Sequence, residues 1–180
     1  MPGSCRFVSR RRNSICGDQV RHGNEFLSGK GAQMFGGRWN SRGMRAVYSS
    51  LEPATAAKES YQNFADYGFS KRSIQPRVFI GADVSLQCVL DLSNRKVLHR
   101  LGFTTRDLIT EDWKAIQDCG QESWTQAIGR GCFLLGFEGL LAPSARDAPK
   151  GKNLIYFPDK LMPGSPIRIM GGDQLPNHPS

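Results

Sequence analysis

Hydrophobic and polar residues follow a mixed pattern, in which short apolar runs alternate with polar, glycine-rich stretches. Alternating or continuous apolar runs predict short strands at residues 6–9, 45–50, 77–82, 87–92, 139–142, 153–157 and 167–170. A helical period fits residues 53–67, 94–101 and much of 111–128 better. Strands outnumber long helices and do not alternate regularly with them. This order favours an α+β fold over a doubly wound sheet.

The helix predicted at residues 53–67 carries the first residue of chemical interest. Pro53 suits the first helical turn, because its missing N–H has no partner there. Glu59 falls between Ala57 and Tyr61 rather than on the apolar face. We therefore expect the Glu59 carboxylate at the edge of a cleft.

Length and composition suit one domain. A chain of 180 residues with 39% hydrophobic content can bury one substantial core. Residues 10–37 are polar and glycine-rich with little periodicity, which predicts a long loop. We therefore expect a single domain over residues 1–180, with a core at about 5–170, a polar loop at 10–30 and a tail at 171–180.

Positive charge is concentrated near the start of the chain. The formal net charge is +8, and residues 1–46 hold nine Lys and Arg residues against Asp18 and Glu25. Such a segment attracts phosphate, nucleic acid or an acidic protein partner. Arg10, Arg11 and Arg12 are equally well interpreted as a solubilising tail.

Cysteine, histidine and hydropathy patterns exclude several classes of protein. The five cysteines are scattered without a C-x-x-C pair, which is typical of reduced cytosolic thiols. The three histidines are isolated, so we expect no metal. No apolar run approaches the ~20 residues of a membrane helix, and no signal peptide is recognisable. We expect a soluble cytoplasmic protein without a membrane partner, although export into a target cell is not excluded.

A glycine-rich turn and two residues beyond it suggest nucleotide chemistry. Gly36-Gly37-Arg38-Trp39-Asn40 is followed by Tyr48 and Glu59. A guanidinium binds phosphate oxygens, a tyrosine ring can stack on a ligand ring, and a carboxylate stabilises an oxocarbenium-like state. Individually, such an arginine is also common on surfaces, and such a glutamate on solvated helix faces. The combination points to NAD, although neither a Walker A nor a Rossmann glycine motif is present.

Two blocks of sequence resemble the RES domain family, which is named for its arginine, glutamate and serine. Residues 31–43, Val47-Tyr48-Ser49 and Ala56-Ala57-Lys58-Glu59 are similar to the first block. Residues 139–146 and 151–157 are similar to the C-terminal block, where a Pro-Ser-Ala turn precedes an asparagine that leads a strand. The resemblance covers roughly residues 5–170.

The resemblance implies a fold, an activity and a partner. RES domains resemble the ADP-ribosyltransferase toxin fold, with a split β-sheet core, flanking helices and a cleft for NAD. They act as toxins that degrade NAD by hydrolysis or phosphorolysis, and each is paired with an antitoxin or immunity protein, often of the Xre type. NAD would be the substrate, and no metal cofactor is implied.

The family also implies roles for particular residues. Arg38 would hold the diphosphate or the nicotinamide ribose, and Tyr48 would pack on the nicotinamide ribose. Glu59 would stabilise the ribosyl cation or orient the ribose hydroxyl. Ser144 would complete the pocket, whereas alone it would be interpreted as a turn or capping residue. Arg38, Tyr48 and Glu59 form the implied catalytic set. The implied NAD-binding set is Arg38, Tyr48, Ser144, Arg6, Gly37 and Asn153.

Two other functions remain open on the sequence alone. A mono-ADP-ribosyltransferase would share the NAD pocket but would leave ADP-ribose on a protein target. A nucleic-acid-binding module without catalysis would use the basic first 46 residues, although no recognisable DNA- or RNA-binding motif supports it. Steep salt dependence and indifference to Glu59→Ala would favour the binding module.

Overall fold

Seven strands form one mixed sheet in the computed structural model, which describes residues 12–18, 27–66 and 78–170. The strand order is β4-β5-β6-β2-β1-β3-β7, and only the β4–β5 pair is parallel. The strands are β1 (Arg12–Asp18), β2 (Val47–Ser50), β3 (Val78–Val84), β4 (Val89–Asp91), β5 (Gly139–Pro143), β6 (Lys152–Tyr156) and β7 (Ile167–Ile169).

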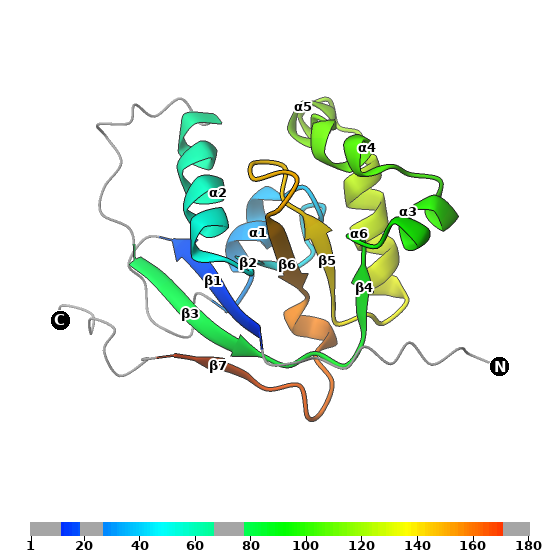
Figure 1. The fold of residues 1–180 in the computed structure, drawn as a ribbon. Coiled ribbons are helices and arrows are strands. Elements are labelled where there is room, and N and C mark those ends of the chain that lie inside the picture. Colours follow the sequence, from blue (N-terminus) through cyan, green and yellow to red (C-terminus); the bar gives the residue numbers. More distant parts are fainter. Residues whose placement is uncertain (1–11, 19–26, 67–77, 171–180) are drawn as a thin grey trace.

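The sheet is divided between β1 and β2. These two strands share one register pair, Ile15 with Ser50, whereas β1 and β3 pair along all of β1. The sheet therefore consists of a half formed by β4, β5, β6 and β2 and a half formed by β1, β3 and β7 (Figure 1). The expected α+β fold with a split sheet is confirmed.

Helices flank the sheet at two places. They are α1 (Lys30–Phe35), α2 (Pro53–Asp66), α3 (Arg95–Leu101), α4 (Thr105–Thr110), α5 (Trp113–Asp118) and α6 (Trp124–Leu134), with the 3₁₀ turn η2 (Pro158–Lys160). Helix α2 contacts both β1 and β2, and α4 and α6 contact β5. In Figure 1 the β5–β6 loop lies between α2 on one side and the α4–α6 group on the other.

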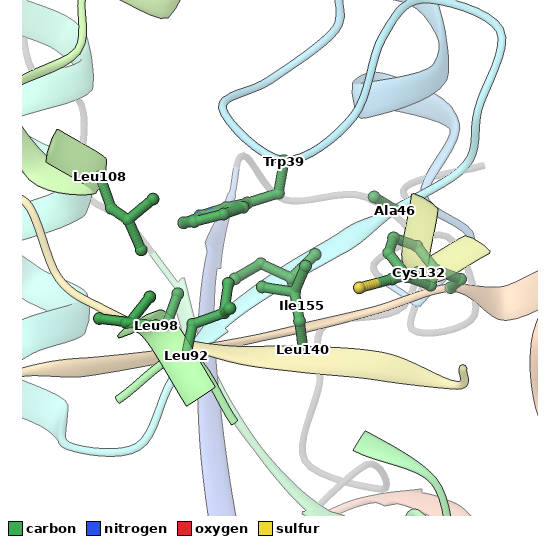
Figure 2. Packing of buried hydrophobic residues seen from close by; sticks show 10 residues of the cluster. Trp39, Ala46, Leu92, Leu98, Leu108, Cys132, Leu140 and Ile155 are labelled. Carbon is green, nitrogen blue, oxygen red and sulfur yellow. The ribbon is translucent and has the colours of Figure 1, made fainter. Parts of the chain in front are cut away.

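Hydrophobic residues on the central strands alternate between two buried clusters. Leu140 and Ile155 belong to one cluster, and their neighbours Leu141 and Leu154 belong to the other. This alternation follows from the period of two along a strand. Figure 2 shows Trp39 lying over Ile155 and Leu140 in the first cluster, so the glycine-rich turn is anchored on the core.

Most of the elements predicted from sequence are present. Helix α2 begins at Pro53 as expected and ends at Asp66. Strands β2 to β7 and helix α3 lie within one or two residues of the predicted ranges. The strand predicted at residues 6–9 lies outside the described residues.

The prediction of a long loop at residues 10–37 is wrong in two places. Strand β1 occupies Arg12–Asp18, and helix α1 occupies Lys30–Phe35. The sequence of β1 does not alternate, and its conformation follows from the ladder with β3 rather than from its own pattern. Helix α1 spans only six residues, too few for a helical period to be recognised.

The helix predicted over much of residues 111–128 is interrupted. Two helices, α5 and α6, are separated by a turn in which Gly120 has φ of 74°. The side chains of Asp112 and Ser123 cap the start of each helix, which explains the interruption. Helix α4, begun by a capping box at Thr104 and Asp107, was not anticipated.

Candidate functional site

Glu59 meets two residues from the other end of the chain. It lies on α2, and its Oε1 accepts hydrogen bonds from Ser144 Oγ at 2.6 Å and Asn153 Nδ2 at 2.7 Å. None of the residues that the structure describes donates a hydrogen bond to Oε2. One carboxylate oxygen is therefore fixed by two side chains, and the other keeps its acceptor capacity with respect to the described residues.

Ser144 is oriented so that its hydroxyl proton points to Glu59. The residue follows β5, and its side chain is completely buried. Its Oγ accepts hydrogen bonds from the backbone N–H groups of Arg146 at 3.1 Å and Asp147 at 3.0 Å. A hydroxyl has two acceptor lone pairs and one proton, so the proton remains for Glu59.

Asn153 is oriented by its neighbour on the adjacent strand. It lies on β6 opposite Ser50 of β2, and Ser50 Oγ donates to Asn153 Oδ1 at 2.8 Å. Because the amide oxygen is engaged with Ser50, the amide nitrogen faces Glu59. Strands β2, β5 and β6 thus all contribute to holding one carboxylate.

Arg38 lies on the glycine-rich turn and is held through one of its nitrogens. Its Nη1 donates to the carbonyl oxygens of Leu108 at 2.9 Å and Glu111 at 3.0 Å. Partial burial lowers the pKa of Arg38 from its ordinary value, and the charge of Glu111 opposes this shift. The guanidinium stays cationic, since arginine does not deprotonate in proteins. It keeps further N–H groups for an anionic ligand.

Arg38 and Glu59 interact electrostatically. The charges of Arg146 and Glu59 both act on the Arg38 guanidinium, Arg146 lowering its pKa and Glu59 raising it. The glycine-rich turn after α1, the first half of α2 and the loop after β5 therefore bring two guanidinium groups and one carboxylate within electrostatic range. This combination suits a ligand that carries phosphate and develops positive charge nearby.

Tyr48 fixes the glycine-rich turn through its hydroxyl. Tyr48 Oη accepts from the Trp39 backbone N–H at 2.8 Å and donates to Asn40 Oδ1 at 2.8 Å. Burial raises the pKa of Tyr48, so the hydroxyl stays protonated. A Cβ at Gly37 would lie 2.5 Å from Tyr48 Oη, so only glycine fits there.

Asn40 is a site residue that the sequence analysis did not select. It is completely buried, and the two protons of its Nδ2 group are shared among three carbonyl oxygens. These acceptors are Ala32, Ser41 and Met44, at 2.9, 3.1 and 2.9 Å. A single amide therefore closes the loop between α1 and β2. Its place beside Arg38 in the glycine-rich motif was the only signal in the sequence.

The residues selected from sequence fall into two groups. Glu59, Ser144 and Asn153 are joined by hydrogen bonds, and Gly37 and Tyr48 are in direct contact beside Arg38. Arg6 lies outside the described residues. Their roles toward a ligand remain predictions.

Removal of the Tyr48 hydroxyl should destabilise the fold. Tyr48→Phe leaves the Trp39 N–H and the Asn40 amide oxygen without their partner, and a buried unpaired polar group costs about 1–3 kcal/mol. We expect the free energy of unfolding, measured by urea denaturation, to fall by about that amount.

Thr110→Val is the control for Tyr48→Phe. The Thr110 hydroxyl donates to the Arg106 carbonyl on an exposed face of α4. Exposed substitutions of this kind usually change the free energy of unfolding by less than about 0.5 kcal/mol. An equally small change in Tyr48→Phe would contradict a structural role for the hydroxyl.

Metal ligands and membrane helices were sought in the described part of the chain. There, no group of three or more His, Cys, Asp or Glu side chains is arranged to hold a metal ion. The helices described here are too short or too polar to span a bilayer.

A sequence profile described as the RES domain matches residues 16–174. The chain belongs to the RES domain family. Curated relatives include proteins named NAD(+) phosphorylase MbcT from Mycobacterium tuberculosis and Mycobacterium bovis. Each is 28% identical over 130 residues, which cover 66% of this chain and 61% of the relative. The match thus spans less than two thirds of the relatives' own length.

A solved structure has the same fold as this RES domain. It is the crystal structure of the M. tuberculosis MbcT-MbcA toxin-antitoxin complex, and the matching chain has a TM-score of 0.72 and 21% sequence identity. The match covers 93% of this chain and 90% of the other. The similarity therefore extends over nearly all of the RES domain.

Proposed function

We propose that this RES domain cleaves the nicotinamide N-glycosidic bond of NAD. The observation that carries the proposal is the Glu59 carboxylate, held by Ser144 and Asn153 through one oxygen while no described residue donates to the other. Membership of the RES family and similarity to a protein named NAD(+) phosphorylase support NAD as the substrate.

Arg38 binds the anionic part of NAD in this proposal. Its Nη1 is committed to two backbone carbonyls, which fixes the direction of the guanidinium. The remaining N–H groups suit diphosphate oxygens. Tyr48 and Gly37 hold the turn in place, and the half-buried Tyr48 ring borders the nicotinamide ribose.

The bond between nicotinamide nitrogen and ribose C1′ breaks heterolytically. Its electron pair leaves with the nitrogen, so nicotinamide departs as a neutral molecule and needs no general acid. Positive charge develops on the ribose, and the Glu59 carboxylate stabilises it. Addition of water then gives ADP-ribose and a proton, whereas addition of inorganic phosphate gives ADP-ribose 1-phosphate.

Similarity to known proteins also supports a proposal about the partner. We propose that the protein is a toxin neutralised by a cognate antitoxin, because its structural neighbour was solved in a toxin-antitoxin complex. We place its action in the cytoplasm, where NAD is available.

We also propose that residues 1–180 form one domain, since both buried clusters share the same sheet.

The test is NAD consumption by the purified full chain, with and without inorganic phosphate. Separation of nicotinamide, ADP-ribose and ADP-ribose 1-phosphate by chromatography identifies the acceptor. Label transferred to a protein instead would favour a mono-ADP-ribosyltransferase. No loss of NAD by folded protein would contradict the proposal.

Arg38→Ala should raise the KM for NAD by about 10- to 100-fold, because a charge-assisted hydrogen bond contributes about 1.5–3 kcal/mol. Steady-state kinetics of nicotinamide release measure this effect. Arg42→Ala is the matched control, since Arg42 is an exposed arginine of the same segment with no hydrogen bond to any described residue. Equal KM values for both variants would remove Arg38 from the proposed site.

A further inference from the structure

Asp147 joins the β5–β6 loop to the helix that carries Glu59. Thr55 Oγ1 of α2 donates to Asp147 Oδ2 at 2.6 Å, and Lys58 Nζ forms an ion pair with Asp147 Oδ1. Thr55 lies four residues before Glu59, so both side chains are on the same face of α2. Thr55 is also almost completely buried, with 1% exposure. The carboxylate of Asp147 is therefore fixed beside the first turns of α2.

The same residue also orients Ser144. The Asp147 backbone N–H donates to Ser144 Oγ at 3.0 Å, beside the N–H of Arg146. These two donors direct the Ser144 proton to Glu59 Oε1. Asp147 thus contacts α2 through its side chain and Ser144 through its backbone.

The loop has little room to move at this point. The Asp147 carbonyl accepts from the Gly151 N–H at 2.7 Å, and the Gly151 carbonyl accepts from the Ser144 N–H at 2.9 Å. A Cβ at Gly151 would lie 2.6 Å from Asp147 Cβ and 2.8 Å from Thr55 Cγ2. Loop and helix are therefore in direct contact.

We propose that Asp147 is a positioning residue, which clamps the β5–β6 loop to α2 so that Ser144 engages Glu59 Oε1 and Oε2 is presented to the ribose. Asp147 acts through Ser144 and does not touch the substrate. The part of the inference that concerns turnover rests on the proposed NAD cleavage.

Asp147→Ala should lower kcat for NAD by about 10- to 100-fold, since displacement of a reacting group by about 1 Å costs up to 10²-fold. The KM for NAD should change less than about threefold, because Arg38 is untouched. Asp118→Ala is the control, since Asp118 forms a comparable lysine ion pair with Lys114 on α5. The control should keep the activity of the unmodified protein. Unchanged kcat in Asp147→Ala would overturn the proposal.

Thr55 variants test the clamp without removing the loop carboxylate. Thr55→Val removes the hydroxyl that donates to Asp147 and keeps the shape of the side chain, so kcat should fall about three- to tenfold. Thr55→Ser keeps the hydroxyl and should restore kcat. Equal activity of the valine and serine variants would count against the clamp.

A double variant tests whether Asp147 affects turnover through Ser144 or independently of it. If Asp147 acts through Ser144, Asp147→Ala should lower kcat by less than about twofold when Ser144→Ala is already present. A full multiplicative loss in the double variant would contradict the proposed route.

Amide hydrogen exchange gives a readout that does not need turnover. The N–H groups of Arg146 and Asp147 are hydrogen-bonded to Ser144, so Thr55→Val should accelerate their exchange at least tenfold, and Thr55→Ser should not. Accelerated exchange in a protein that never cleaves NAD would support the clamp and refute the proposed function. NAD cleavage with exchange unaltered in Thr55→Val would refute the clamp alone.

Discussion

Glu59→Gln should lower kcat for NAD cleavage by about 10²- to 10³-fold and leave the fold intact. The substitution removes the negative charge that faces the developing ribosyl cation, and preorganised electrostatic groups at reacting centres contribute effects of this size. Glutamine matches glutamate in shape. Its amide oxygen can accept the hydrogen bonds that Ser144 and Asn153 donate to Glu59.

Those two donors also determine the orientation of the glutamine amide. Ser144 and Asn153 each present a proton to Oε1, so the amide oxygen must take that place. The NH₂ group then occupies the position of Oε2. Glu59→Gln should therefore replace the carboxylate oxygen that faces the ligand with a hydrogen-bond donor, which opposes positive charge.

Steady-state kinetics and a thermal unfolding curve measure the effect of Glu59→Gln. Glu52→Gln is the matched control, because Glu52 is an exposed glutamate that directly precedes α2. It should keep the kcat of the unmodified protein. A fully active Glu59→Gln variant would show that the Glu59 carboxylate does not stabilise the transition state.

Gly129→Ala should destabilise the protein and also impair the site. Gly129 lies on α6, where a Cβ would be 1.8 Å from the carbonyl oxygen of Trp39. Such contact forces α6 and the glycine-rich turn apart by about 1 Å or more. Because Trp39 follows Arg38, the guanidinium would shift with the turn, and kcat/KM should fall by about 10²-fold.

Two opposing terms decide the sign of the stability change at position 129. Alanine is favoured over glycine inside a helix by about 1 kcal/mol. Overpacking a buried contact costs about 1–3 kcal/mol and occasionally more. The clash with the Trp39 backbone lies at the severe end, so we expect a net loss of about 2 kcal/mol in the free energy of unfolding.

Gly131→Ala separates these two terms on the same helix. Apart from its chain neighbours and the backbone of its own helix, no described atom lies within 4 Å of a Cβ placed at Gly131, so helix propensity decides the change. Urea denaturation should show a gain of about 0.5–1 kcal/mol for Gly131→Ala and a loss for Gly129→Ala. If both variants were stabilised, α6 would not contact the Trp39 backbone as described.

Local patterns were sufficient where an element has a regular period and a clear boundary. Helix α2 has a proline start and a helical stripe, and β5 and β6 are short apolar runs. Strand β1 has neither signal. Its conformation depends on pairing with β3, about sixty residues later, and such pairing is invisible to a local pattern.

Residues of the candidate site also differ in how far the local sequence could predict them. Arg38, Tyr48 and Glu59 were selected because their residue types match a known chemistry, and Ser144 and Asn153 were selected through the family resemblance. The hydrogen bonds that orient them join residues up to 103 positions apart. Residues that act only through such contacts, such as Asn40 and Asp147, carry no chemical signature of their own.

The division of the sheet has a consequence for how the protein can be inactivated. Helix α2 spans the boundary, since it contacts both β1 and β2, which share a single register pair. The strands that hold Ser144 and Asn153 lie on one side only. Because α2 contacts both halves, we expect a mutation that separates β1 from β2 to strain the hydrogen bonds that Ser144 and Asn153 donate to Glu59.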